Sequence, residues 1–476
     1  MNDNESVFGG GAGDDRAPDG RMSRRSLLKL GGMALGGAAL GPTLAACGSG
    51  GGGSSSNKVT VWWNSGFYDS ENQAVKAIAE DFGKQSGMKV DLQFYSTDAI
   101  PTKEQSAITS GVLPDVVMAE NGNTSTYAYQ GKLADVSDVV SSQQFTDGAT
   151  KAVHLFNSKA GKAGNYAVPV NQFTVPMFFW KDMLTDAGSD PSSIPDDWDG
   201  FWQYFQSAQG SYRSKTGKKA YAVGWPMSTS AGDTNYDTQM MLMAFGAMVL
   251  DDNGGLKADD PQIKANMAKA LGFLGDLFKN GFTPKDVVNW DDSGNNTAFL
   301  NKTIILTPNG SLSIPGSIKD KDHAEWANIV TQPFPNKPDG SGPVPAMAQV
   351  HNAVVFEDSP NKKGGMDFLK FFVKPENTLK YLKAGHGRWH PVQEQVLSNP
   401  YFADSDDPNI KVSTAMLSGA TQPAWLNASV AYNHAALQGL WGKAIGQIVL
   451  QNQSPESAAD FAVQQLKAAF STYPAK

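Results

Sequence analysis

The sequence predicts an α/β fold, because short β-branched and aromatic runs alternate along the chain with segments of helical periodicity. Residues 59–63 (VTVWW) are the first such run, and residues 70–85 follow with apolar side chains on one helical face. This alternation favours βαβ units and a mostly parallel sheet. The chain beyond residue 46 has 476 − 46 = 430 residues, which is long for one core and predicts two lobes or domains.

The later elements are predicted from the same signals and from helix caps. Alternating polar and apolar residues predict a strand at 89–95, and the apolar run DVVM predicts a buried strand at 115–118. Gly111 and Pro114 end the helix before that second strand. Further helices are expected at 102–110, 198–209, 234–249, 261–280, 433–450 and 454–473, another begins at 374, and a strand covers 302–307.

The N-terminal segment reads as an export signal. A basic pair, Arg24 and Arg25, precedes an apolar run that ends in Leu-Ala-Ala-Cys at Cys47. The run is rich in glycine and short of the roughly 20 apolar residues that span a bilayer. The paired arginines resemble a twin-arginine signal, and the sequence ending at Cys47 and followed by Gly48 resembles a bacterial lipobox. We expect a signal peptide over 1–46 and a lipidated Cys47 that begins a flexible linker over 47–57; the alternative is an uncleaved N-terminal anchor.

Composition narrows the classes of partner. The formal net charge is −8 and no basic run stands out, which argues against nucleic acid and anionic lipid. Cys47 is the only cysteine, so no internal disulfide is expected. His386 and His390 have the spacing of a zinc pair, but the glycines and the proline around them break the helix that such a pair requires. No cofactor motif occurs, so we expect no metal and no cofactor.

Five segments, taken in order, resemble family 1 extracellular solute-binding proteins, the maltose-binding-protein-like group. They are residues 108–122 (ITSGVLPDVVMAENG), 131–140, 165–184, 316–335 and 353–373. The resemblance implies a two-lobed periplasmic-binding-protein fold, type II-like, with a hinge that the chain crosses more than once. We expect lobe 1 to comprise 58–168 plus 325–354, and lobe 2 to comprise 169–324 plus 355–476.

The resemblance also implies a function. The protein would be a lipid-anchored monomer on the extracytoplasmic face of a bacterial cell membrane. It would capture a small solute, most simply a carbohydrate, and deliver it to the permease of an ATP-binding-cassette (ABC) importer without catalysing a reaction. Two alternatives stay open. A secreted glycoside hydrolase needs two carboxylates about 5–10 Å apart, which Glu120 and Asp233 could supply. A receptor for glycerophosphodiesters needs several cationic groups, and Arg388 alone is evident, which favours a neutral sugar.

Ligands of open α/β sheets lie beyond the carboxyl ends of the strands, so the candidate site residues are in loops. Two adjacent tryptophans point to opposite faces of a strand, and we expect Trp63 rather than Trp62 in the cleft. Trp225 and Trp389 are further aromatic platforms, with Trp425 as an additional candidate. Glu120, Asp233 and Arg388 could instead be solvated or paired at the surface. The expected ligand-binding residues are Trp63, Asn64, Glu120, Asn121, Trp225, Asp233, Asn235, Ser311, Arg388 and Trp389.

The lipobox gives a direct prediction. Cys47→Ser removes the only thiol that could carry a lipid, so the exported protein should move from the membrane fraction to the soluble fraction, as measured by fractionation and immunoblotting. Replacing Arg24 and Arg25 with lysine should block export instead. A Cys47→Ser protein that stays in the membrane fraction would refute the lipobox interpretation.

Overall fold

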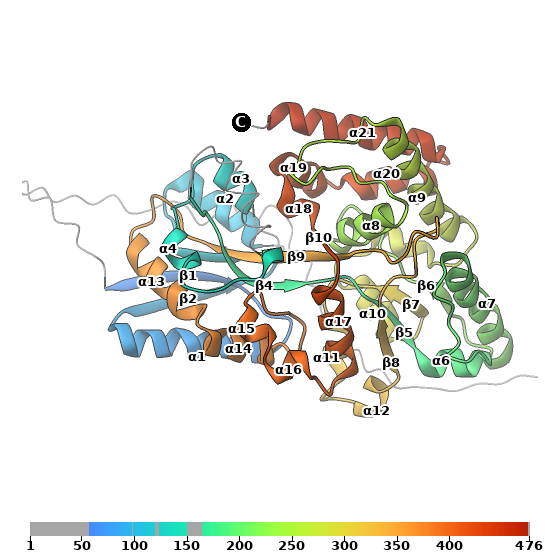
Figure 1. The fold of residues 1–476 in the computed structure, drawn as a ribbon, viewed down its shortest axis with the longest axis horizontal. Coiled ribbons are helices and arrows are strands. Elements are labelled where there is room, and N and C mark those ends of the chain that lie inside the picture. The colour runs from blue at the N-terminus through green and yellow to red at the C-terminus, as the bar shows by residue number, and fades with distance from the viewer. Residues whose placement is uncertain (1–56, 98, 120–122, 150–163, 475–476) are drawn as a thin grey trace, which may run out of the picture. The chain divides into compact units, whose positions relative to one another are not determined.

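Two mixed β-sheets with helices packed on them organise the chain (Figure 1). The computed structural model describes residues 57–97, 99–119, 123–149 and 164–474, and residues from Ser55 onward form one compact unit. The expected signal peptide, Cys47, Glu120 and Asn121 lie outside the described residues. None of the described helices is both long and apolar enough to cross a membrane.

The first sheet has the strand order β10-β9-β3-β1-β2, and β4 pairs with β9. β1 is parallel to β2 and to β3, whereas β9 is antiparallel to β3 and β4. The strands are β1 (Lys58–Asn64), β2 (Lys89–Tyr95), β3 (Val116–Ala119), β4 (Val168–Phe173), β9 (Ala346–Val354) and β10 (Thr421–Pro423).

The second sheet has the order β6-β7-β5-β8. β6 and β7 are parallel, and β5 is antiparallel to both β7 and β8. The expectation of a mostly parallel sheet holds for β1, β2 and β3 of the first sheet. It is wrong for the second sheet, where β5 runs against both of its neighbours. The strands are β5 (Met177–Trp180), β6 (Tyr221–Val223), β7 (Ile304–Pro308) and β8 (Ile329–Gln332).

Capping residues set several helix ends. Gly87 adopts a left-handed conformation (φ 72°) just beyond α1, and the Asp197 and Asp260 carboxylates cap α7 and α9. The longer helices are α1 (Asp69–Ser86), α2 (Ile100–Ser110), α7 (Trp198–Thr216), α8 (Asp233–Ala244), α9 (Pro261–Lys279), α13 (Lys362–Phe372), α14 (Pro375–Ala384), α17 (Pro408–Ser418), α19 (Val430–Leu437), α20 (Leu440–Val449) and α21 (Pro455–Thr472). Shorter ones include α3 (Thr124–Tyr129), α6 (Lys181–Ala187), α10 (Gly294–Leu300), α11 (Ser313–Ile318) and α18 (Trp425–Ala428).

Most predicted elements are confirmed, and three helices differ. The helix expected at 198–209 continues to Thr216. The helix expected at 433–450 is two helices, α19 and α20, because Gly439 between them adopts a left-handed conformation (φ 74°) that a helix cannot continue through. The helix expected at 234–249 ends earlier, at Ala244.

The packing of two segments differs from the expected lobe division. Helices α13 and α14 belong to the expected lobe 2. α13 packs against strand β1 of the first sheet and against α1, and α14 packs against α1. Strand β8, expected in lobe 1, pairs with β5 in the second sheet. The chain passes from the first sheet to the second through residues 174–176 and returns through 333–345.

Candidate functional site

A cavity of about 350 Å³ is lined by residues from both sheets. Its walls include the loop after β1, the loop after β2 and the loop after β7, each at the carboxyl end of its strand, as expected for an α/β protein. The volume falls in the range typical of small-molecule sites. The cavity is therefore the candidate functional site. Its lining residues come from 65–67, 96–97, 292–296, 309–313 and 388–389, together with Phe173, Asp233, Tyr236 and His351.

The first wall is the loop after β1, with Ser65, Gly66 and Phe67 at the cavity. Asn64 lies just behind it and donates from Nδ2 to Thr97 Oγ1 over 2.7 Å, which ties this loop to the one after β2. A Cβ atom on Gly66 would lie 2.5 Å from Glu71 Cβ, so this position requires glycine. Asn64 thus supports the wall, although it does not line the cavity.

The opposite wall is a buried polar network centred on Asn295. Its Nδ2 donates to Asp233 Oδ2 and to Asn309 Oδ1, each over 3.0 Å. Asn309 in turn donates to Ser313 Oγ over 2.9 Å, and Asn296 donates to the same hydroxyl over 3.2 Å. The network fixes the start of α8, the start of α10 and the loop after β7 relative to one another.

A buried ion pair forms the third wall. Arg388 Nη1 lies 3.3 Å from both carboxylate oxygens of Glu71, which is 1% exposed. Glu71 also accepts from Trp389 Nε1 over 2.9 Å and from the Tyr68 backbone N–H over 3.0 Å. The Arg388 guanidinium carbon lies 3.9 Å from the centre of the Trp389 ring. One face of Trp389 is therefore already covered by Arg388.

Burial governs the titration of the carboxylates. The pKa of Asp233 is raised well above its usual value, chiefly by burial and then by the charge of Asp292, against the opposing effects of Asn295 and Arg388. Burial also raises the pKa of Asp237, one helical turn along α8, and the neighbouring Asp233 and Asp292 charges add to this. His351 shifts the other way: burial, helped by Arg388, lowers its pKa to about 3, so the ring is neutral at ordinary pH.

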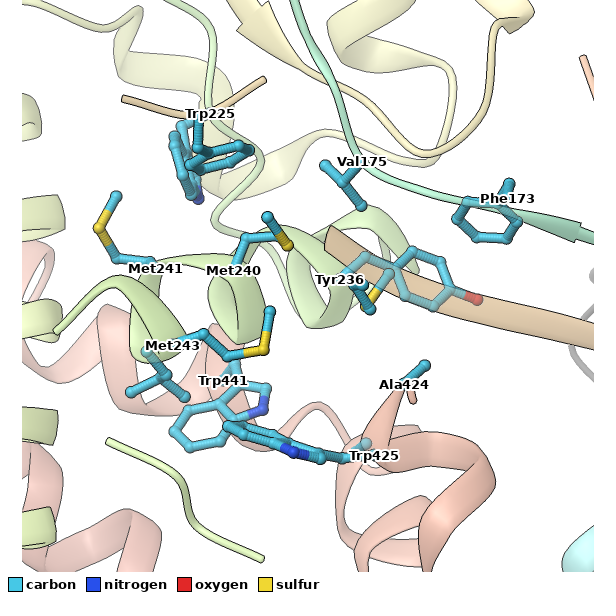
Figure 2. Packing of buried hydrophobic residues seen from close by; sticks show 14 of the residues in the cluster. Phe173, Val175, Trp225, Tyr236, Met240, Met241, Met243, Ala424, Trp425 and Trp441 are labelled. Atoms are coloured by element: carbon cyan, nitrogen blue, oxygen red, sulfur yellow. The ribbon is translucent and has the colours of Figure 1, made fainter. Parts of the chain in front are cut away.

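Four aromatic side chains line the cavity, and they differ in exposure. Phe67 is 49% exposed, whereas Phe173, Tyr236 and Trp389 are buried. Phe173 packs edge-on against Tyr236 with ring centroids 5.2 Å apart, and Figure 2 shows the two rings side by side. Phe67 is therefore the aromatic surface most available to a ligand.

A second, smaller cavity of about 60 Å³ adjoins the first, since Tyr236 and His351 line both. It is rich in amide side chains, including Asn235, Gln349, Asn352, Asn427 and Asn433. Asn235, predicted as a ligand-binding residue, lies here rather than in the larger cavity.

Four of the predicted ligand-binding residues lie together at the larger cavity: Asp233, Ser311, Arg388 and Trp389. Ser311 adopts a left-handed backbone conformation (φ 73°), which is uncommon for a non-glycine residue and occurs often at functional sites.

Two predicted aromatic platforms are corrected. Trp63 is 1% exposed and packs against Phe372 at a centroid distance of 4.5 Å, because it shares the inward face of β1 with Val59 and Val61. Trp225 is fully buried between Trp202 and Phe334. Figure 2 shows it above the methionines of α8.

The additional candidate Trp425 is also a core residue. It is 3% exposed and packs edge-on against Tyr432. Figure 2 shows it below α8, near Trp441.

Sequence reasoning missed several residues of the site. Ser65 and Phe67 lie in the loop after the first strand. They could have been found by including every residue of that loop among the candidates, since ligands lie beyond the carboxyl ends of strands. Asp292 and Asn296 follow no predicted strand, and Phe173, Tyr236 and His351 lie inside elements, so no local signal marked them. In the described part of the chain, no group of three or more His, Cys, Asp or Glu residues could hold a metal ion.

The Glu71–Arg388 pair gives a prediction for stability. Glu71→Gln keeps the side-chain size but removes the buried negative charge that lies 3.3 Å from Arg388, so the free energy of unfolding should fall by about 3 kcal/mol or more. Urea unfolding measures this, and the double variant Glu71→Gln with Arg388→Met should lose less than the sum of the single losses. Asp367→Asn, at an ion pair that is largely exposed, is the control and should change stability by about 0.5 kcal/mol or less. A Glu71→Gln effect as small as that of the control would contradict this account.

Comparison with known proteins agrees with this architecture. Residues 77–411 match the model of the family described as bacterial extracellular solute-binding protein. A maltooligosaccharide ABC transporter solute-binding lipoprotein of Streptococcus pneumoniae serotype 4 is 27% identical over 223 residues, which are 45% of this chain and 46% of that relative. The match thus spans about half the length of the curated relative.

Solved structures show the same fold. Maltose-bound MalE3 of T. maritima superimposes with a TM-score of 0.68 at 18% identity, covering 86% of this chain and 99% of that one. A sugar transporter protein of Arthrobacter chlorophenolicus A6 with bound laminaribiose gives 0.69 at 20% identity, covering 86% and 99%. The fold is the two-lobed fold of periplasmic binding proteins. With the family model matching well over half of its length, the chain belongs to the family of bacterial extracellular solute-binding proteins.

Proposed function

We propose that this protein is a receptor that binds a small carbohydrate in the cavity between its two sheets and delivers it to an ABC importer. The observation that carries the proposal is the cavity itself, in which the half-exposed Phe67 ring stands near convergent polar groups from Asp233, Ser311 and Arg388. A sugar has apolar C–H faces that can stack on an aromatic ring and hydroxyls that need donors and acceptors. This combination of flat aromatic surface and a few placed polar groups suits it.

The relatives support the same class of ligand. The Streptococcus pneumoniae relative is named for maltooligosaccharide, and the two solved structures hold maltose and laminaribiose. Of the two carboxylates that the hydrolase alternative would use, Glu120 lies outside the described residues. Asp233 and the described lining residue Asp292 lie on one wall, where Asp292 Oδ1 accepts from the backbone N–H of Asp233 over 3.3 Å, and do not flank the cavity as a pair of catalytic carboxylates would.

The N-terminal sequence and the family support a setting for the receptor at the cell membrane. We propose that residues 1–46 are a twin-arginine signal peptide, that Cys47 carries the lipid anchor and that the linker up to residue 57 holds a monomeric receptor at the extracytoplasmic face of the membrane. Closure of the two lobes around residues 174–176 and 333–345 would present the loaded form to the permease.

Phe67 gives a test of the proposal. Thermal shift with maltose, maltotriose, laminaribiose and cellobiose first identifies a ligand, since a ligand at 100 times its Kd adds about 2.7 kcal/mol of stability. Phe67→Ala should then weaken calorimetric binding of that ligand by about 2 kcal/mol, the loss typical of a stacking aromatic. The melting temperature without ligand should barely change, because the side chain is half exposed.

Leu450→Ala is the matched control, since Leu450 is 62% exposed and does not line the cavity. It should bind like the wild type. Equal binding by both variants would remove Phe67 from the site, and the absence of binding by any saccharide would reject a carbohydrate receptor.

A further inference from the structure

The charged groups at the larger cavity are unbalanced. Among the described residues, Asp233, Asp292 and Arg388 line the cavity, and Glu71 supports it through Arg388 and Trp389. Asp237 lies one helical turn further along α8, fully buried. The one cation lies 3.3 Å from the Glu71 carboxylate, and no lysine is present among the described lining residues. The raised pKa values of Asp233 and Asp237 mean that these groups hold their protons more readily than free carboxyl groups. A cation against the wall built by α8, α10 and the loop after β7 would stabilise their ionised forms.

Two buried acceptors near this wall have no donor within the described structure. Asn296 lines the cavity, is 7% exposed, and its Oδ1 accepts no hydrogen bond. Asp237 is fully buried, and neither of its carboxylate oxygens has a partner. Buried acceptors normally find a donor, so the Asn296 oxygen at the cavity surface points to a ligand that donates hydrogen bonds.

A cation at this wall is better supplied by an organic ammonium group than by a metal ion. The described Asp, Glu, His and Cys residues form no group of three or more that could hold a metal ion. Phe67, Phe173 and Tyr236 line the same cavity, and aromatic faces attract ammonium groups. An ammonium group also offers N–H donors, which both the carboxylates and Asn296 Oδ1 can accept.

We propose that the preferred solute is a saccharide that carries an ammonium group, an amino sugar or a short amino-sugar oligomer, with that group against Asp233, Asp292 and Asn296. This inference rests on the proposed function and names its substrate class. The sequence favoured a neutral sugar over an anionic phosphodiester. The carboxyl groups of this wall again disfavour an anion, and they favour a cation over a neutral ligand.

Binding should also release protons. The carboxylate pKa values of Asp233 and Asp237 are raised by burial and by their neighbours, and a nearby ammonium stabilises the ionised forms and lowers those values. The other titratable or charged groups around them are Asp292 before α10, Arg388, Glu71 and Tyr68 at the start of α1, and His351 on β9. His351 is neutral, and the Tyr68 pKa is raised, chiefly by burial, so neither residue supplies the released proton.

The test compares matched saccharides that differ by an amine in place of a hydroxyl. The pairs are glucosamine with glucose, the chitosan disaccharide with cellobiose, and the chitosan trisaccharide with cellotriose, titrated calorimetrically at mildly acidic pH. In at least one pair the amine should bind about tenfold tighter or more, as expected for a charge-assisted hydrogen bond. Repeating the titration in buffers of different ionisation enthalpy should show proton release.

Asp292→Asn should remove most of the preference for the amine, because it deletes a charge while keeping an oxygen that can accept from the backbone N–H groups of Gly232 and Asp233. Asp252→Asn, at an exposed position outside the cavity, is the control and should keep the preference.

The outcomes separate this inference from the proposed function. If the neutral sugar binds as tightly as its amine in every pair, or if Asp292→Asn leaves an amine preference unchanged, the inference fails while the carbohydrate receptor stands. If no saccharide of either kind binds, both fail. If Asp292→Asn does not fold, the affinities of the wild-type protein for the amine and hydroxyl members of each pair still decide whether the inference holds.

Discussion

The buried ion pair between Glu71 and Arg388 is the interaction on which the candidate site depends most. It joins the first turn of α1 to a segment 317 residues later in the chain. Taking two charges out of water is costly, and the pair is sustained only because Glu71 also accepts from Trp389 and from the Tyr68 backbone. The arrangement orients the Arg388 guanidinium over Trp389 and within 5.5 Å of the Phe67 ring centre. The same region reaches the second sheet through Tyr68, whose hydroxyl donates to the Ser313 carbonyl over 2.9 Å.

The two faces of the cavity therefore have different physical characters. The face built by α1 and residues 388–389 is an aromatic surface with a matched charge pair. The face built by α8, α10 and the loop after β7 is a network of amides and hydroxyls with an excess of carboxylates around Asn295 and Asp233. A ligand that spans both faces needs an apolar side and a polar, donor-rich side. Saccharides meet this requirement, and the carboxylate excess adds a preference for positive charge.

The fold was largely predictable because its signals are local. Helix-ending residues such as Gly111 and Pro114 and the apolar strand runs placed most of the predicted elements within a few residues. The strand directions were not predictable. β9 pairs antiparallel with β3, and β5 pairs antiparallel with β7, and both pairings join residues that are far apart in sequence. The loops that follow β1 and β7 and the segment with Arg388 were found, because the carboxyl ends of strands and an isolated basic residue beside an aromatic one are visible in sequence.

The site was predicted less well, for reasons that individual residues show. The alternation of Val59, Val61 and Trp63 on one face of β1 could have assigned that tryptophan to the core. Trp225 could not be assigned in this way, because its partners Trp202 and Phe334 come from distant elements. Glu71 was overlooked because an acidic residue in the first turn of a helix is usually solvated, and only the tertiary structure brings Arg388 to it.

The most direct test of the central claim, that the solute binds between the two sheets, is a crystal structure with the tightest-binding saccharide of the panel. The account predicts ligand density in the 350 Å³ cavity, with a sugar face on Phe67 and polar contacts to Asp233 and Arg388. Density elsewhere on the protein, with this cavity empty at a saturating concentration of the saccharide, would contradict it.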